Sequence, residues 1–197
     1  MNIIENETND FKWYDMSTGL RAVQLSYVIS WAFENNIENE KLLKLLNMVH
    51  LHLEHLSSPE LRGRGNHLFF QMHGILAICE NVPIMAACEE AQKYAYNHFD
   101  AELSNQFKSD GMHVEHSPGY HTYVSFVLNN LYKSNWYSGE LGQKIEKPLS
   151  LIPYLFHPNG NMVLIGDTEH DDPNLYNKLH QNVRYFTSDG SLGQPPS

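Results

Sequence analysis

The sequence predicts an all-α protein in which antiparallel helical hairpins follow one another along the chain. Three observations support this fold class. Apolar residues recur with a helical period over most of the chain, and short turn-forming stretches separate these segments. Strand character is confined to one short stretch near the C-terminus. No repeat consensus recurs at a fixed spacing, so an α/α toroid or an irregular bundle is favoured over a curved solenoid.

Six helices are expected, in three consecutive pairs. They cover residues 17–34, 38–56, 66–79, 83–99, 119–134 and 139–156. In the first segment the helical period is kept by Leu20, Val23, Tyr27, Val28 and Trp31. Pro148 and Pro153 are expected to break up the last helix, because proline has no backbone N–H to donate within a helix.

The two cysteines fall in the second pair of helices. Cys79 and Cys88 lie almost symmetrically about Pro83, in the connection between the two segments. A disulfide across this hairpin and two buried free thiols both fit the spacing, and free thiols are the favoured interpretation. The cysteines therefore do not show whether the protein lies in an oxidising or a reducing compartment.

The chain changes character after Pro158. Asn159-Gly160 predicts a turn, and residues 162–165 predict a short strand or extended stretch that ends at Gly166-Asp167. We expect a flexible N-terminus over residues 1–10, one domain over residues 11–180 and a loose tail over residues 181–197.

Composition limits the function classes. The chain has 197 residues, 42% of them hydrophobic, which suits one domain with a core. No apolar run reaches the roughly 18 to 20 residues of a membrane span, and the acidic start of the chain is not a secretion signal. A formal net charge of −10 argues against nucleic acid as a partner. It also disfavours a polyanionic ligand unless basic groups concentrate locally.

Residues 110–121 are the part of the chain richest in chemistry. They place His113, Glu115, His116, Tyr120 and His121 in a turn and the first turn of a helix. Ser117 suits the N-cap and Pro118 the first helical position. Such a density of titratable groups at the start of a helix is typical of catalytic loops.

A second group precedes the third helix. Arg62-Gly63-Arg64-Gly65 leads into Asn66-His67, so a basic, glycine-bearing loop runs into a helix N-terminus. Free N–H groups and the helix dipole favour an anion there. The alternative is that Asn66 only caps the helix and that the arginines are solvated.

These groups carry a family resemblance. The relevant residues, in order, are Trp13-Tyr14-Asp15 with Arg21, Asn66-His67, Asp110-Gly111, Ser117-Pro118-Gly119-Tyr120-His121, Gly160 and Gly166-Asp167-Thr168. Over residues 11–168 the chain resembles the helical domain of the heparinase II/III-like polysaccharide lyases, which include alginate and oligoalginate lyases. The resemblance implies an incomplete α/α toroid. It also implies a β-sandwich domain, which supplies a further catalytic histidine in the family and is absent from this chain. The first toroid helices are also expected to be missing, so the chain reads as a partial lyase-like domain.

The resemblance implies β-elimination at a 4-linked uronic acid. Asn66, with His67 beside it, would neutralise the uronate carboxylate, and Tyr120 would be the proton acid, or acid and base. An ordinary tyrosine titrates near pH 10, so its use as a base needs nearby positive charge from His67 or His121. The scheme requires neither a metal nor a cofactor.

We also expect a set of substrate-binding residues. They are Arg62, Arg64, His113, Glu115, His116, His121, Trp13 and Tyr14. Two interpretations stay open for His113, Glu115 and His116: they line a sugar subsite, or they order their loop through hydrogen bonds. The expected partners are an anionic uronate polysaccharide or oligosaccharide and the missing β-sandwich domain. A periplasmic or exported location is implied for the full-length protein.

Two other functions compete with the lyase. Three histidines and Glu115 in residues 113–121 supply enough ligands for a zinc hydrolase, although the His-Glu-x-x-His pattern of a metalloprotease helix is absent. In the second, a helical domain binds a uronate chain without cleaving it, and Asn66, Tyr120 and the aromatic residues contact the sugar.

Overall fold

The computed structural model describes residues 13, 15–157, 161–168, 185–186 and 192–193. The chain divides into two compact units, Met1–Glu102 and Leu103–Ser197. The all-α prediction is confirmed. None of the helices in the described part of the chain has both the length and the apolar character needed to cross a bilayer.

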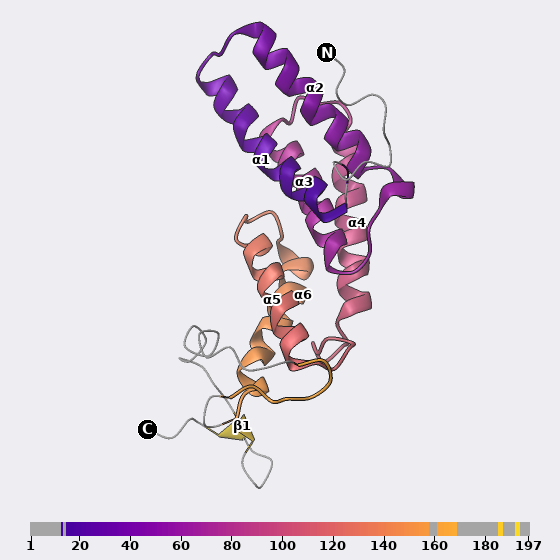
Figure 1. The fold of residues 1–197 in the computed structure, drawn as a ribbon, viewed down its shortest axis with the longest axis vertical. Coiled ribbons are helices and arrows are strands. Elements are labelled where there is room, and N and C mark those ends of the chain that lie inside the picture. Colours follow the sequence, from indigo (N-terminus) through magenta and orange to yellow (C-terminus); the bar gives the residue numbers. More distant parts are fainter. Residues whose placement is uncertain (1–12, 14, 158–160, 169–184, 187–191, 194–197) are drawn as a thin grey trace. The chain divides into compact units, whose positions relative to one another are not determined.

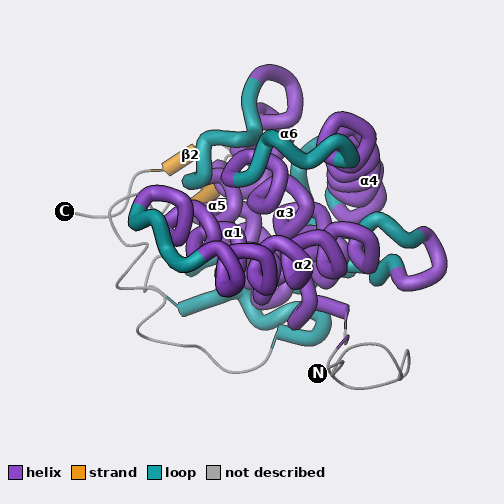
Figure 2. The backbone as a smooth tube through the Cα atoms, turned by 90° about the horizontal axis from the view of Figure 1, so that it is seen from above, coloured by secondary structure: helices purple, strands orange, loops and turns teal. Residues whose placement is uncertain are grey.

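The first unit is built from α1 (Asp15–Glu34), α2 (Asn39–Leu56), the short 3-10 helix η2 (Pro59–Leu61), α3 (Asn66–Asn81) and most of α4 (Cys88–Gln106). Helices α1, α2 and α3 pack against one another (Figures 1 and 2). Nearly every residue of α3 after its first turn is buried, as expected for a helix that is apolar on all sides. Helix α3 is therefore the centre of this unit.

Two glycines allow α1 and α3 to approach closely. A Cβ on Gly74 of α3 would lie 2.8 Å from the carbonyl oxygen of Gly19 and 3.1 Å from Cβ of Ala22, both in α1. A Cβ on Gly19 would overlap the carbonyl group of Phe70. Only glycine fits at these two positions without a shift of the helices, because the neighbouring atoms are backbone.

The buried face of α1 consists mostly of small residues. It comprises Thr18, Gly19, Ala22, Ser26, Ile29 and Ala32. The bulky residues whose period predicted the helix lie on the opposite side, where Leu20, Tyr27, Val28 and Trp31 are 44%, 53%, 46% and 57% exposed. The helix prediction is confirmed, but the unit buries the small-residue face because close packing on α3 leaves no room for large side chains.

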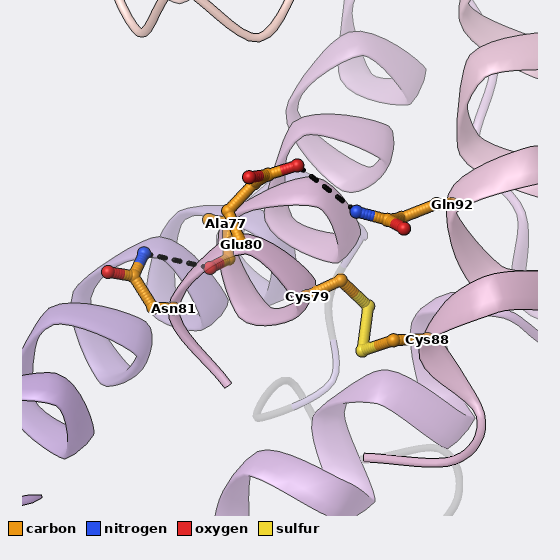
Figure 3. The surroundings of a disulfide bond; sticks show 6 residues. All are labelled: Ala77, Cys79, Glu80, Asn81, Cys88 and Gln92. Carbon is orange, nitrogen blue, oxygen red and sulfur yellow. Dashed lines mark hydrogen bonds between the residues drawn. A yellow bond between two sulfur atoms is a disulfide. The ribbon is translucent and has the colours of Figure 1, made fainter. Parts of the chain in front are cut away.

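Cys79 and Cys88 form a disulfide that joins the end of α3 to the start of α4 (Figure 3). The prediction that both are free thiols is wrong. Residues 82–88 form turns, with the Met85 N–H donating to the Val82 carbonyl and the Cys88 N–H to the Met85 carbonyl. These turns bring the two Cα atoms to 5.3 Å, within the range that a disulfide requires. They also delay the start of α4 from the predicted residue 83 to Cys88.

The second unit begins with the last turn of α4 and contains α5 (Pro118–Tyr132), α6 (Gly139–Leu151) and the 3-10 helix η3 (Ile152–Leu155). The short strands β1 (Tyr185–Phe186) and β2 (Leu192–Gly193) pair antiparallel. Helix α5 packs against α6 and η3. Helix α6 continues through Pro148 and ends at Leu151, so the prediction that Pro148 breaks the last helix is wrong; η3, which contains Pro153, follows.

The predicted extended stretch at residues 162–165 is present only at its start. Met162 bridges Phe156, and the Val163 N–H donates to the Leu155 carbonyl at 2.8 Å. Met162 packs in a small apolar cluster with Ile152, Leu155 and Phe156. The Asn159-Gly160 turn, residues 1–10 and most of the tail lie outside the described residues. The single-domain boundaries 11–180 stay a prediction.

The close contact between α1 and α3 predicts the effect of Gly74→Ala. At an exposed helical site, glycine to alanine stabilises a protein by up to about 1 kcal/mol. At Gly74 the added methyl would push α1 away, and we expect the free energy of unfolding to fall by about 2 kcal/mol. Urea unfolding measures this change. An equal or higher stability of the variant would show that the two backbones do not meet at this position.

The disulfide predicts a second stability effect. Removing it with Cys79→Ser and Cys88→Ser together should lower the free energy of unfolding by about 2 to 3 kcal/mol, since the bridge restricts a short loop in the unfolded chain. A reducing agent should lower the stability of the unmodified protein by a similar amount and leave the double variant, the matched control, unchanged. If the native protein instead reacts with a thiol reagent at both cysteines, no bridge exists.

Candidate active site

The entrance of α5 is held by two side chains that are far apart in sequence. Ser117 is the N-cap, as predicted, and its Oγ accepts the Tyr120 N–H at 3.3 Å. Thr168 Oγ1 accepts the Gly119 N–H at 3.0 Å and lies 3.1 Å from Ser117 Oγ. Both N–H groups of the first turn are thus satisfied within the protein. The turn that carries Thr168 therefore fixes the backbone on which Tyr120 stands.

His121 is completely buried and connects three segments. Its Nε2 lies 3.0 Å from the carbonyl oxygen of Pro148 in α6, and its Nδ1 accepts the His113 N–H at 3.2 Å. A carbonyl oxygen only accepts, so Nε2 carries the hydrogen and the ring is neutral. Burial lowers the pKa of His121, which agrees with this state. His121 therefore supplies no positive charge to Tyr120.

His113 is buried in the same way and supports the loop. Its Nε2 lies 3.4 Å from Oε1 of Gln106, and its Nδ1 accepts the Glu115 N–H at 3.3 Å. Burial lowers the pKa of His113. Both nitrogens of His113 and both of His121 are engaged inside the protein. Of the two open interpretations, this geometry favours loop ordering for His113.

Tyr120 lies half-buried beside this network. Its ring packs edge-on against His113, with centroids 4.9 Å apart, and lies 6.1 Å from the ring of Tyr123. Burial, followed by the negative charges of Glu115 and Tyr123, raises the pKa of Tyr120. At neutral pH the phenol therefore keeps its proton, which suits a proton donor better than a base.

The exposed residues between His113 and the N-cap Ser117 are Val114, Glu115 and His116. His116 has a left-handed backbone, with φ +54°, and its Nε2 accepts a hydrogen bond from Lys108 Nζ at 2.8 Å. Lys108 could not be identified from the sequence, because a single lysine after a largely polar helix end carries no signal of its own. Glu115 and His116 are the polar residues of this stretch that a ligand can reach.

Asn66 and His67 begin α3 in the first unit. The N-cap is Gly65, with φ +64°, so the alternative that Asn66 caps the helix is wrong. His67 Nδ1 lies 2.8 Å from Oδ2 of Asp15, and this contact holds the ring in place. The other oxygen of Asp15 is buried and has no hydrogen-bond partner within the described residues. Asp15 had no assigned role in the sequence, because its partner is 52 residues away.

The basic loop before α3 is anchored from inside the unit. The buried Gln71 side chain accepts the Gly63 N–H at 2.7 Å and donates to the Leu61 carbonyl at 3.3 Å. Arg62 is exposed and its Nη1 lies 2.9 Å from Nε2 of His98, and Arg64 is exposed as well. Gln71 was missed because it sits within a run of buried apolar residues. The structure brings Arg62, Arg64, Asn66 and His67 into one loop and helix start.

Trp13 is engaged by neighbouring side chains. Its ring stacks on His55, with centroids 4.5 Å apart and planes inclined by 21°, and Arg21 lies over the ring at 5.7 Å. A sugar would have to replace one of these neighbours to stack on Trp13. Tyr14 lies outside the described residues.

The described residues contain no group of three His, Cys, Asp or Glu side chains placed to hold a metal ion. The zinc hydrolase considered above required His113 and His121 as ligands. Their ring nitrogens are instead used in hydrogen bonds to the protein. The structure therefore gives no support to that alternative.

Comparisons with known proteins agree with the resemblance. The family model described as "Heparinase II/III N-terminus" matches residues 2–193. No curated protein matches the chain. The solved structure of the heparan sulfate lyase HepC from Pedobacter heparinus is similar with a TM-score of 0.70 and 19% identity, over 100% of this chain and 34% of that one. A heparinase III structure is similar with a TM-score of 0.60 and 23% identity, over 82% of this chain and 28% of that one.

These likenesses confirm the predicted fold class, the α/α toroid type of the heparinase III helical domain. The chain spans about a third of the length of the solved relatives. With a family model that matches nearly its whole length, this chain belongs to the heparinase II/III family and corresponds to its N-terminal part.

Proposed function

We propose that the protein acts in polysaccharide β-elimination, with Tyr120 as the proton donor to the departing oxygen. Membership of the heparinase II/III family supports a polysaccharide lyase. The observation that carries the specific role is the position of Tyr120, fixed at the entrance of α5 and kept protonated by its raised pKa. The proposed substrate is a polysaccharide with 4-linked uronic acid.

The reaction sets the requirements for the other residues. A base removes the C5 proton, the C4–O bond breaks, and a double bond forms between C4 and C5. The departing oxygen takes a proton, here from the Tyr120 phenol. Because neutral His121 leaves the pKa of Tyr120 raised, we assign removal of the C5 proton to another group. The histidine that the family's β-sandwich domain supplies is our candidate.

Asn66 and His67 are proposed to stabilise the uronate carboxylate. Negative charge builds up on that group as the C5 proton leaves, so donors that strengthen their contact at this stage lower the barrier. The Asn66 amide is half-buried at the N-terminus of α3, and Asp15 holds His67 with Nε2 directed away from the shared contact. Arg62 and Arg64 add positive charge to the same loop and are proposed to contact the saccharide, as are Glu115 and His116 in the second unit.

A helical domain that binds carbohydrate without cleaving it is the competing proposal, and the exposed arginines before α3 would serve it equally well. The lyase and the binding domain differ in whether a new product forms. Elimination creates a conjugated unsaturated uronate that absorbs ultraviolet light, whereas binding alone creates none. Absorbance measured with heparan sulfate and with alginate therefore separates the two proposals.

The assigned roles predict the effects of two substitutions in the full-length protein. Tyr120→Phe should lower kcat by on the order of a hundredfold or more and leave the Kd for the polysaccharide within about twofold. Asn66→Ala should lower kcat by a similar factor, because carboxylate stabilisation is lost. The rate of appearance of the unsaturated product measures both.

Two matched variants serve as controls. Tyr123→Phe removes the neighbouring exposed hydroxyl of α5, and Asn47→Ala removes an exposed amide of α2. Both should retain full turnover. If Tyr120→Phe and Asn66→Ala retained turnover as well, or if Tyr123→Phe were equally impaired, the role assignment would be wrong.

A further inference from the structure

A cleft in the second unit brings three lysines together. It lies between the last turn of α4, the turn at residues 107–111 and α6, with a volume of about 360 Å³. Leu103, Phe107 and Pro148 form apolar walls, and three lysines, Lys108, Lys144 and Lys147, line it. We call it the lysine cleft.

The clustering of these lysines is unusual for this chain. The whole protein has 13 Lys and Arg against 23 Asp and Glu. In the described stretches 103–157 and 161–168, the basic residues are the three of the lysine cleft and Lys133. An acidic protein that binds a polyanion needs such local concentration of positive charge to overcome its own repulsion.

Two of the three ammonium groups are held by neutral acceptors. Lys108 Nζ donates to His116 Nε2 at 2.8 Å, and Lys147 Nζ donates to the Ser109 carbonyl. Neither of these two contacts offsets the positive charge of the ammonium group, and each uses one of its three N–H donors. Lys144 pairs with Glu140 at 3.5 Å across a largely exposed surface, an interaction that solvent weakens.

The turn also contains one carboxylate, Asp110. Its Oδ1 accepts the Met112 N–H at 2.9 Å, so this oxygen is directed to the backbone of its own loop. Gly111, with φ +95°, lets this turn lie on α6, where a Cβ would come within 3.0 Å of Lys147 Cγ and 3.1 Å of Leu151 Cδ1. The wall that carries Lys108 is thus fixed against the helix that carries Lys144 and Lys147, and the lysines are positioned before any ligand binds.

We propose that the lysine cleft is a binding subsite for an anionic group of the saccharide chain, a sulfate ester or a uronate carboxylate. Its apolar walls suit the ring faces of a sugar and its lysines suit the charged substituent. The saccharide identity rests on the proposed function, but the cleft contains none of the proposed catalytic residues. The cleft also adjoins the Tyr120 support: Phe107 packs edge-on against His113, and the Pro148 carbonyl binds His121.

The test is a binding measurement with a labelled heparan sulfate hexasaccharide. The Lys108→Gln and Lys144→Gln double variant leaves Lys147, and with it the turn, in place. We expect its Kd to rise about tenfold, roughly threefold for each exposed charge contact. The control double variant, Lys41→Gln with Lys44→Gln, removes the same charge from α2 and should change Kd less than about twofold.

A desulfated hexasaccharide identifies the anionic group. A tenfold effect that persists with it supports the subsite with carboxylate as the bound group, and an effect confined to the sulfated form supports it with sulfate. Equal weakening in both double variants, or no weakening in either, overturns the proposal. The measurement does not depend on turnover. If the protein forms no unsaturated product but still binds the saccharide through the lysine cleft, only the lyase function is refuted.

Discussion

The hydrogen bonds of His121 are the interaction on which the second unit depends. One ring nitrogen binds the Pro148 carbonyl of α6 and the other accepts the His113 N–H of the preceding loop. This single buried side chain connects α5, α6 and the loop, and it does so as a neutral donor and acceptor. His113 repeats the arrangement with Gln106 and Glu115. These polar contacts support the loop and the helix start on which Tyr120 lies.

Local electrostatics reconcile an acidic chain with the anionic ligand that we propose for it. The net charge of −10 would repel a uronate polysaccharide at a distance. In the first unit, Arg62 and Arg64 lie in the loop before α3. In the second, three lysines share one cleft. Each unit thus offers its own positive surface, and association should weaken as salt concentration rises.

Helices and the α5 entrance could be predicted from sequence because their signals are local. The cap at Ser117 and the start of α3 at Asn66 follow from residue preferences within one turn. Several features that the sequence did not predict depend on contacts between distant residues. The small-residue face of α1 is chosen by Gly74, more than fifty residues away from Gly19. Thr168 and Asp15 act on residues some fifty positions away, and the disulfide depends on turns that the single Pro83 did not reveal.

The protonation state of the two buried histidines is the most direct test of the hydrogen-bond network that supports Tyr120. Long-range proton–nitrogen NMR correlation spectra report which ring nitrogen of each histidine carries a hydrogen. We predict that His113 and His121 are both neutral at neutral pH, with hydrogen on Nε2 and none on Nδ1. An imidazolium at His121, or hydrogen on its Nδ1, would contradict the network and with it the assignment of Tyr120 as a proton donor alone.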